Sequence, residues 1–512
     1  MALITAYWGL DGMIILMTLI ITAYLYMTRK FKYWKKRGIL EITPIPFFGN
    51  FKECLLQKKA PAYFLKDIYD EMKDLPYVGF YVLDKPFLLV RNRELVKNIL
   101  VKDFSYFSDR YNTADPIDRI GYANLFFIRN PAWKVIRTKL TPFFTSGKMK
   151  KMFDLMLICV KNLDEYLDAL ELEGNGKTIE VRELTAKFAT DIIGSTAYGL
   201  DVNSFKDPNA EFRKYGKMIF QYDTYRAFEM LAIFFLPTLV RLTRIKMFGK
   251  EPTDFMRKVF WETLTQRMKS GLKRNDLVDI LLELKNNNND NDLKDFTFDG
   301  DDLLAQAASF FSAGFETSST TTTFALYELA MQPEIQNALR KEIFEALEKS
   351  NGKITYDMIM SLPYMDMVVS ETLRKYPPLG FLNRKTMETY QIPNFNLVLE
   401  KDTPVYIPML ALHYDPEYFP NPEKFDPERF NEENKRNMPS CVYFPFGDGP
   451  HACIGNRFAL LLIKLALIKM LNKYEVTPCE KTMIPMIIDP ALSLTGPLNS
   501  VIYLNMRKAN TD

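Results

Sequence analysis

The sequence predicts a mainly α-helical protein with small peripheral β-sheets, forming a single large domain behind an N-terminal transmembrane helix. Three observations predict this arrangement. Apolar residues recur at helical spacing through most of the chain after residue 130, short alternating apolar stretches are few, and an uncharged apolar run opens the sequence. With 47% hydrophobic and 25% charged residues, the 512-residue chain has an ordinary globular composition. That composition argues against disorder and against many membrane spans.

The apolar run at the start predicts a membrane anchor over residues 1–28. Residues 12–27 carry no charge, and Asp11 is the only charged residue within 3–27, so the run is long enough to cross a bilayer. Six cations and no anion follow between residues 29 and 37. Positive flanks stay in the cytosol, and a cleavable signal peptide carries its charge before the apolar run, so a retained anchor with a cytosolic body is expected. A buried core helix is the alternative.

The next segment, residues 29–50, combines this basic stretch with a proline hinge. Pro44 and Pro46 restrict the backbone, and Gly49 followed by Asn50 permits a turn. Residues 51–512 contain neither an internal repeat nor a linker long enough to divide them, so they predict one large domain.

The domain begins with two short strands, at 77–83 and 87–90, joined by a turn around Asp84-Lys85-Pro86. Helical periodicity then predicts helices over roughly 131–172, 183–198, 210–248, 252–285, 301–331, 333–349, 365–376 and 455–473. The polar run 286–292 predicts a surface loop, and the proline- and aromatic-rich segment 377–450 predicts short strands within an extended meander.

Charge and ligand counts exclude several functional classes. Lys plus Arg number 66 against 63 Asp plus Glu, a balance that argues against general nucleic-acid binding. The only histidines are His413 and His451, too few for a multi-histidine metal site. The five scattered cysteines are typical of reduced intracellular thiols.

One segment near the C-terminus concentrates the chemistry. In Phe446-Gly447-Asp448-Gly449-Pro450-His451-Ala452-Cys453, a loop rich in Gly and Pro presents a cysteine just before a helical run. Unpaired N–H groups at a helix start stabilise a thiolate. The thiolate would be a nucleophile with one of the two histidines as base, or an axial ligand of haem iron; Gly447-x-Gly449-x-x-Ala452 alone is a weak dinucleotide motif.

The spacing Phe446-x-x-Gly449-x-x-x-Cys453-x-Gly455 is similar to the haem-binding loop of the cytochrome P-450 (haem-thiolate monooxygenase) family. From the composition, such a match is expected by chance roughly 10⁻³ times per chain. The resemblance implies haem b as cofactor, Cys453 as axial iron ligand, Phe446 and Gly455 as haem contacts, and a cytochrome P-450-type fold.

Three further motifs resemble those of the family. Glu371 and Arg374 match its ExxR helix, and Arg429 stands where the family completes a buried ion-pair network. Removing one member of such a network leaves an unpaired buried charge.

Glu316 and Thr317 lie in the long helical run 301–331, where the resemblance implies that they guide protons to bound dioxygen. A carboxylate beside a hydroxyl can feed a proton relay. The alternative is a helix kink in which Thr317 bonds its own backbone.

Trp133 and Arg137, four residues apart on one helical face, match the family's propionate-binding pair, and Arg384 matches another propionate ligand. His451 occupies a position where the family more often has arginine, which leaves a shorter, titratable donor.

Analogy with the family also suggests the substrate pocket and the partners. Apolar contacts are expected from the loop 104–128 and from Phe310, Phe311, Ala313, Leu379 and Phe381. Electrons would come from NADPH through a membrane-bound NADPH–cytochrome reductase, with a small b-type cytochrome as a second donor, and O2 is the co-substrate. A basic stretch would face the reductase: Lys134, Lys139, Lys148, Lys150 and Lys151.

The anchor and Asn-Arg-Lys at 383–385 look most like the microsomal, insect xenobiotic-metabolising branch, in the endoplasmic reticulum membrane. Two other functions stay open. One is a haem-thiolate isomerase or dehydratase acting on a peroxide, and the other is a haem protein that only binds a ligand.

Overall fold

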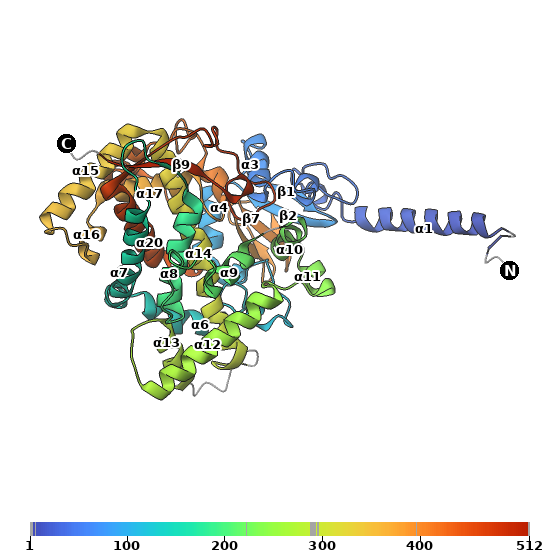
Figure 1. Cartoon of the computed structure of the whole chain (residues 1–512). Coiled ribbons are helices and arrows are strands. Elements are labelled where there is room, and N and C mark those ends of the chain that lie inside the picture. The colour runs from blue at the N-terminus through green and yellow to red at the C-terminus, as the bar shows by residue number, and fades with distance from the viewer. Residues whose placement is uncertain are drawn as a thin grey trace.

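The computed structural model describes residues 4–5, 7–221, 223–286, 293, 296–395 and 397–509. Residues 287–292 of the predicted polar loop lie outside the described residues. The mainly helical architecture with small sheets is confirmed, and Figure 1 shows one long helix projecting from a rounded body.

The helices of the first half are α1 (Trp8–Thr28), α2 (Lys52–Leu55), α3 (Pro61–Glu71), α4 (Arg93–Lys97), α5 (Arg119–Tyr122), α6 (Ala132–Leu140), α7 (Ser146–Ala169), α8 (Val181–Ala197), α9 (Glu211–Phe220), α10 (Thr224–Phe235), α11 (Pro237–Thr243) and α12 (Lys250–Ser270). Those of the second half are α13 (Leu277–Asn286), α14 (Gly300–Met331), α15 (Pro333–Lys349), α16 (Tyr356–Met360), α17 (Pro363–Lys375), α18 (Met409–His413), α19 (Glu432–Asn437) and α20 (Asn456–Lys473).

The strands form three sheets within the described residues. The four-stranded sheet has the order β1 (Tyr77–Val82), β2 (Lys85–Val90), β7 (Pro404–Ile407) and β4 (Leu382–Lys385), with only the β2–β7 pair parallel. The three-stranded sheet has the order β3 (Lys177–Glu180), β9 (Tyr503–Lys508) and β8 (Tyr474–Thr477), and β5 (Tyr390–Gln391) pairs with β6 (Val398–Leu399). The two strands predicted at 77–83 and 87–90 are β1 and β2.

Helix α1 is the one described helix long and apolar enough to cross a membrane, and almost none of it packs against the body. Figure 1 shows it as a single rod directed away from the body. The chain returns to the body at once, because Arg29 and Lys30 both pair with Asp84 beside β1. The segment predicted as a hinge then joins the sheet edge through the bridges of Glu41 to Gly79 and of Gly49 to Val82.

Helix α14 runs through the middle of the body and packs against α8, α17 and α20. Its contact with α8 depends on Gly314, because a Cβ there would lie 2.6 Å from the Ile193 side chain. The threonine run that follows is a poor helix former because its residues are β-branched. Its hydroxyl groups nevertheless find hydrogen-bond partners within the helix, since Thr321, Thr322 and Thr323 each donate to the carbonyl four residues earlier. The helix can therefore carry polar residues through an apolar core.

Candidate functional site

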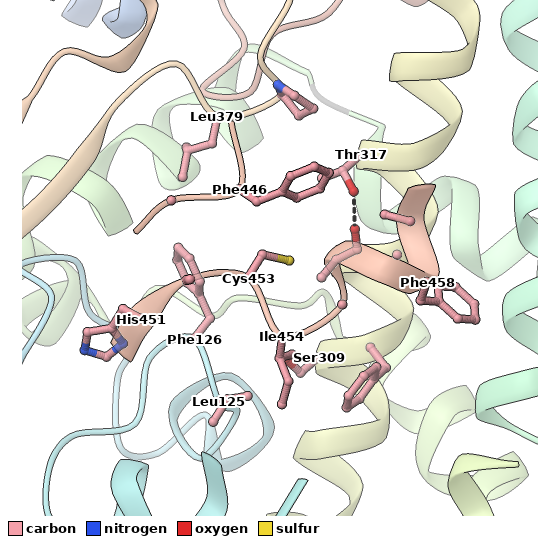
Figure 2. A pocket seen from close by; sticks show the side chains of 18 of the residues that line it. Leu125, Phe126, Ser309, Thr317, Leu379, Phe446, His451, Cys453, Ile454 and Phe458 are labelled. Carbon is pink, nitrogen blue, oxygen red and sulfur yellow. Dashed lines mark hydrogen bonds between the residues drawn. The ribbon is translucent and has the colours of Figure 1, made fainter. Parts of the chain in front are cut away.

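A cavity of about 290 Å³ lies where α14, the start of α20 and the Cys453 loop meet. Figure 2 shows the Cys453 sulfur pointing from its loop toward the side where Thr317 lies, with His451 at the other end of the loop. The ring side chains of its lining are Phe126, Trp133, Phe143, Phe144, Phe310, Phe381, Phe446, His451 and Phe458. The lining also contains three arginines, but neither Asp nor Glu among the described residues.

Backbone hydrogen bonds fix the Cys453 loop. The N–H of Cys453 donates to the Phe446 carbonyl at 2.7 Å, and that of Gly447 donates to the Phe444 carbonyl at 2.8 Å. Gly449 has φ of +68°, and a Cβ there would lie 2.0 Å from the Leu100 carbonyl oxygen, so only glycine fits. The motif spacing seen in the sequence therefore reflects the tight turn that presents the thiol.

The Cys453 thiol is open to the cavity and lies deep in the protein, so its accessible surface faces the cavity and not bulk solvent. Burial raises the pKa of this thiol, while the Gly455 N–H and the charges of Arg137 and Arg110 oppose that effect. Neither histidine is suited to act as its base, because burial and nearby arginine charges hold the pKa of both rings far below the ordinary value. A positively charged ligand bound in the cavity would stabilise the thiolate form of Cys453 better than either histidine.

Three arginines, Arg110, Arg137 and Arg384, line the cavity without a carboxylate partner among the described residues. Burial lowers the pKa of Arg137, and it lowers that of Arg384 to about 10. For Arg110, burial and the charges of its arginine neighbours lower the pKa well below the usual range. Nε of Arg384 is buried and has no hydrogen-bond partner in the described chain.

Within the described chain, Arg110 and Arg384 bond only backbone carbonyls, among them those of Phe126 and Asn383. A set of buried cations without a carboxylate calls for an anionic ligand, because buried charges are normally paired. A haem carries two propionate carboxylates and an iron that accepts a thiolate. The residues present therefore fit this group, with Arg137 and Arg384 among those predicted from the sequence. Arg110 was not singled out, because a lone arginine in the loop 104–128 gives no spacing signal.

Trp133 and His451 both line the cavity and lie against each other, with ring centroids 3.9 Å apart and ring planes tilted by 46°. Burial and the charges of Arg110 and Arg384 push the pKa of His451 far below its ordinary value, so the ring is neutral. Its Nε2 lies 2.8 Å from the Ser108 carbonyl, which only accepts, so Nε2 carries the proton. In this state the Nδ1 atom of His451 has no proton to offer a carboxylate, unlike an arginine at the same position.

One face of α14 forms a wall of the cavity. The lining residues Phe310, Ala313, Gly314, Thr317, Ser318 and Thr321 follow helical spacing. Leu379 and Phe381 join them from the segment before β4, as predicted for the pocket. Phe311 does not line the cavity, which corrects the prediction: it lies 100° further round the helix, packed against Phe212 and Phe315. Helical spacing alone could not have excluded it, because Phe311 lies only about 20° around the helix from Ser318, which does line the cavity.

The predicted proton pair is divided between the two sides of α14. Thr317 lines the cavity, and its hydroxyl donates to the Ala313 carbonyl at 2.6 Å, as Figure 2 shows. Glu316 does not line the cavity, because its Oε1 accepts from Nη2 of Arg182 on α8 at 2.6 Å. Arg182 reaches onward to the Ser500 carbonyl. The alternative reading, in which Thr317 bonds its own backbone, describes the hydroxyl in this state.

The predicted ion-pair network is assembled in the structure. Glu371 and Arg374 are fully buried, and Nε and Nη2 of Arg374 donate to the two carboxylate oxygens at 2.7 and 2.8 Å. Arg429 comes from the turn Pro427–Phe430 and places its Nε 3.4 Å from Glu371. Burial raises the pKa of Glu371 against the opposing effect of Arg374. The charged form of the buried Glu371 carboxylate therefore depends on both arginines.

Comparisons with known proteins point the same way. Residues 41–503 match the family model for Cytochrome P450. The chain is 47% identical over 506 residues to Cytochrome P450 6k1 of Blattella germanica, a match that covers 96% of each chain. It is 45% identical over 497 residues to Cytochrome P450 6j1 of the same organism, covering 97% of each. It is 44% identical over 497 residues to Probable cytochrome P450 6g2 of Drosophila melanogaster, covering 94% of this chain and 96% of that one.

Proposed function

Since this chain belongs to the cytochrome P450 family and is a monooxygenase of the oxidoreductase class, we propose that it oxidises a small lipophilic substrate, either a xenobiotic or an endogenous lipid. One atom of O2 enters the substrate, and the electrons come from NADPH through a reductase. One observation carries the proposal: a single cavity joins one thiol, three arginines without a carboxylate, and an otherwise largely apolar lining. That combination suits haem at one end and a lipophilic molecule at the other.

We assign the cofactor as haem b, with Cys453 as the axial ligand. Arg110, Arg137 and Arg384 would hold its propionates, and Trp133 lines the same cavity. When bound, the haem supplies the activation of dioxygen, which no amino-acid side chain performs. The chain's own part is to hold the thiolate, neutralise the propionates and exclude water around the substrate.

We assign the substrate to the part of the cavity lined by Phe310, Ala313, Leu379 and Phe381. Phe310 is held in place by stacking on Phe144, with ring centroids 5.2 Å apart. Aromatic rings of this kind bury apolar area without offering a hydrogen bond. The lining therefore selects for lipophilicity and leaves the identity of the substrate open.

Thr317 is assigned to proton delivery, and its replacement by valine is expected to lower the product formed per NADPH by about tenfold or more. The Thr317 hydroxyl donates its proton in a hydrogen bond to the Ala313 carbonyl. The lone pairs of its oxygen can therefore still accept a hydrogen bond from a group in the cavity. Thr321→Val is the matched control, because Thr321 also lines the cavity and bonds the Thr317 carbonyl. Equal coupling in the wild type and Thr317→Val would contradict the assignment.

Glu316 is assigned to the supply of protons from behind α14. Its carboxylate meets Arg182 and, at 3.4 Å, the Thr320 hydroxyl. The Glu316→Gln variant is expected to fall between Thr317→Val and wild type in product formed per NADPH, because the amide keeps the contact with Arg182 but cannot take up and release a proton. Wild-type coupling in Glu316→Gln would assign this residue to structure alone.

The electron donor is proposed to be NADPH–cytochrome reductase, supported by a small b-type cytochrome, at a basic surface beside the Cys453 loop. Lys134, Lys148 and Lys151 belong to it, together with Arg457, whose guanidinium contacts Ser146 at the start of α7. Lys150 contributes less, since it pairs with Asp357 at 2.8 Å. Charge reversal at Lys148 and Arg457 should raise the KM for the reductase, while turnover driven by cumene hydroperoxide stays the same.

We place the chain in the endoplasmic reticulum membrane, with α1 as a single-pass anchor and the body in the cytosol. The basic residues 29–37 follow the helix directly, and exposed Leu40, Ile45 and Phe47 continue the apolar surface at its base. In sealed microsomes, added protease should digest the body, and a variant lacking residues 1–28 should lose resistance to carbonate extraction. Protection of the body from protease would reverse the proposed orientation.

The test of function uses microsomes that contain the chain and the reductase, supplied with NADPH, ¹⁸O2 and a panel of lipophilic probes such as 7-ethoxycoumarin. Product carrying one ¹⁸O atom, formed only with NADPH, is the expected result. Conversion of a fatty-acid hydroperoxide without NADPH, with both oxygens retained, would instead indicate an isomerase. NADPH consumption no higher than that of the reductase alone, across the panel, would indicate a haem protein that only binds its ligand.

A further inference from the structure

The histidine that does not line the cavity lies between the ion-pair network and the cysteine loop. His413 is the last residue of α18 and is fully buried. Its carbonyl accepts from Nη1 of Arg374 at 2.9 Å, and its ring Nε2 accepts from the backbone N–H of Phe444 at 3.2 Å. One residue therefore contacts both features on which the proposed haem site depends.

The state of the His413 ring follows from these contacts. Burial, with a smaller effect from the charge of Arg374, lowers its pKa to about 3, so the imidazole is neutral. Because Nε2 accepts a hydrogen bond, Nδ1 carries the proton, and Nδ1 is buried without a partner in the described chain. The unpaired Nδ1–H group costs free energy, because a buried donor has lost its bond to water. The protein bears this cost in order to keep Nε2 unprotonated, so that it can accept from the Phe444 N–H.

The hydrogen bond from the Phe444 N–H to His413 fixes the backbone where the cysteine loop begins. The Phe444 carbonyl accepts from Gly447, and two residues later the Phe446 carbonyl accepts from Cys453. The ring of His413 also packs beside Tyr443 and Phe444, with centroids 5.2 and 5.8 Å away. A shift of the Phe444 N–H would therefore pass through this turn to the cysteine.

We propose that His413 is a positioning residue for Cys453, whose neutral imidazole ties the start of the cysteine loop to the Glu371–Arg374 pair. The inference rests on the proposed function, since it assigns His413 a role in thiolate ligation. It makes the ion-pair network more than a support for folding: through His413 the network sets where the sulfur lies in the cavity.

The experiment compares His413→Gln with His413→Met in the full-length, haem-loaded protein. Glutamine and methionine have nearly the same length and shape, but only glutamine has an oxygen that can accept from the Phe444 N–H. The first measurement is hydrogen–deuterium exchange of the peptide that contains Phe444, and the second is the reduced-minus-carbonyl difference spectrum. Tyr443→Phe is the control, because it removes the neighbouring bond from Tyr443 to the Ser370 carbonyl and leaves His413 intact.

In His413→Met, we expect the Phe444 amide to exchange about tenfold faster or more, and the fraction of thiolate-type spectrum to fall by about half or more. His413→Gln and Tyr443→Phe should stay close to the wild type in both measurements. Equal values for methionine and wild type would overturn the proposal, and so would equal perturbation of methionine and glutamine variants, which would indicate packing alone.

Two other outcomes are also decisive. If His413→Met yields no folded protein, His413→Gln decides the matter, and fast exchange at Phe444 in that variant would overturn the proposal. If the wild type itself lacks a thiolate-type spectrum, the proposed function fails, and exchange at Phe444 in the variants still tests the hydrogen bond from which this inference starts.

Discussion

Replacing Cys453 by serine is expected to abolish the strongly red-shifted Soret band of the reduced carbonyl complex and to reduce NADPH-dependent oxidation by more than about a hundredfold. In metal sites, losing only a partner behind a ligand costs about 10- to 100-fold, so losing the ligand itself should cost more. Serine fits the same space but presents a hydroxyl that stays protonated at neutral pH. The loop around it depends on backbone bonds, which the substitution leaves in place.

The control for this experiment is Cys441→Ser. Cys441 lies twelve residues earlier in the chain, is buried, and donates its thiol to the Asp448 carboxylate, but it does not line the cavity. That variant should retain the wild-type spectrum and activity. Matching spectra of the wild type and Cys453→Ser would rule out axial ligation by Cys453 and make a nucleophilic cysteine the leading interpretation.

The parts of the site that were predicted from the sequence are those encoded by local spacing. The Cys453 loop, the Glu371–Arg374 pair and the Trp133–Arg137 pair each depend on a turn or on one helical face, so the residues that matter stand a few positions apart. The structure places the Cys453 loop and the Trp133–Arg137 pair at the cavity and the Glu371–Arg374 pair in a buried network. Their roles toward haem remain proposals, which the substitutions above address.

Contacts between distant segments could not be predicted in this way. Arg182 is 134 residues from Glu316, and nothing in either segment marks them as partners that turn the carboxylate away from the cavity. Arg110 reaches the cavity from an irregular loop, where no periodicity says which side chain points inward. Phe311 was wrong for the same reason, because helical spacing puts it beside Ser318 at the edge of the cavity face, and its packing against Phe212 from a distant helix could not be foreseen.

Arg374→Ala is expected to prevent the chain from folding around haem, so that little haem is retained and the protein is lost to aggregation or degradation. Besides its two bonds to Glu371, the guanidinium donates to the carbonyls of His413 and Pro422. Alanine would leave a buried carboxylate without its strongest partner, which typically costs about 3–5 kcal/mol. A domain has only about 5–15 kcal/mol of stability in total.

The measurement is haem content per folded protein together with the midpoint of urea unfolding, compared with Arg436→Ala. Arg436 also pairs with an acidic residue on its own helix, Glu432, but both side chains are exposed. Water screens that pair, so its loss should leave haem content and the midpoint unchanged.

Arg374→Lys should resemble Arg374→Ala more than the wild type, because an ammonium cannot bond both carboxylate oxygens and two carbonyls at once. If Arg374→Ala keeps wild-type haem content and midpoint, the network does not support the site, and the path from Arg374 through His413 to Cys453 has no energetic basis.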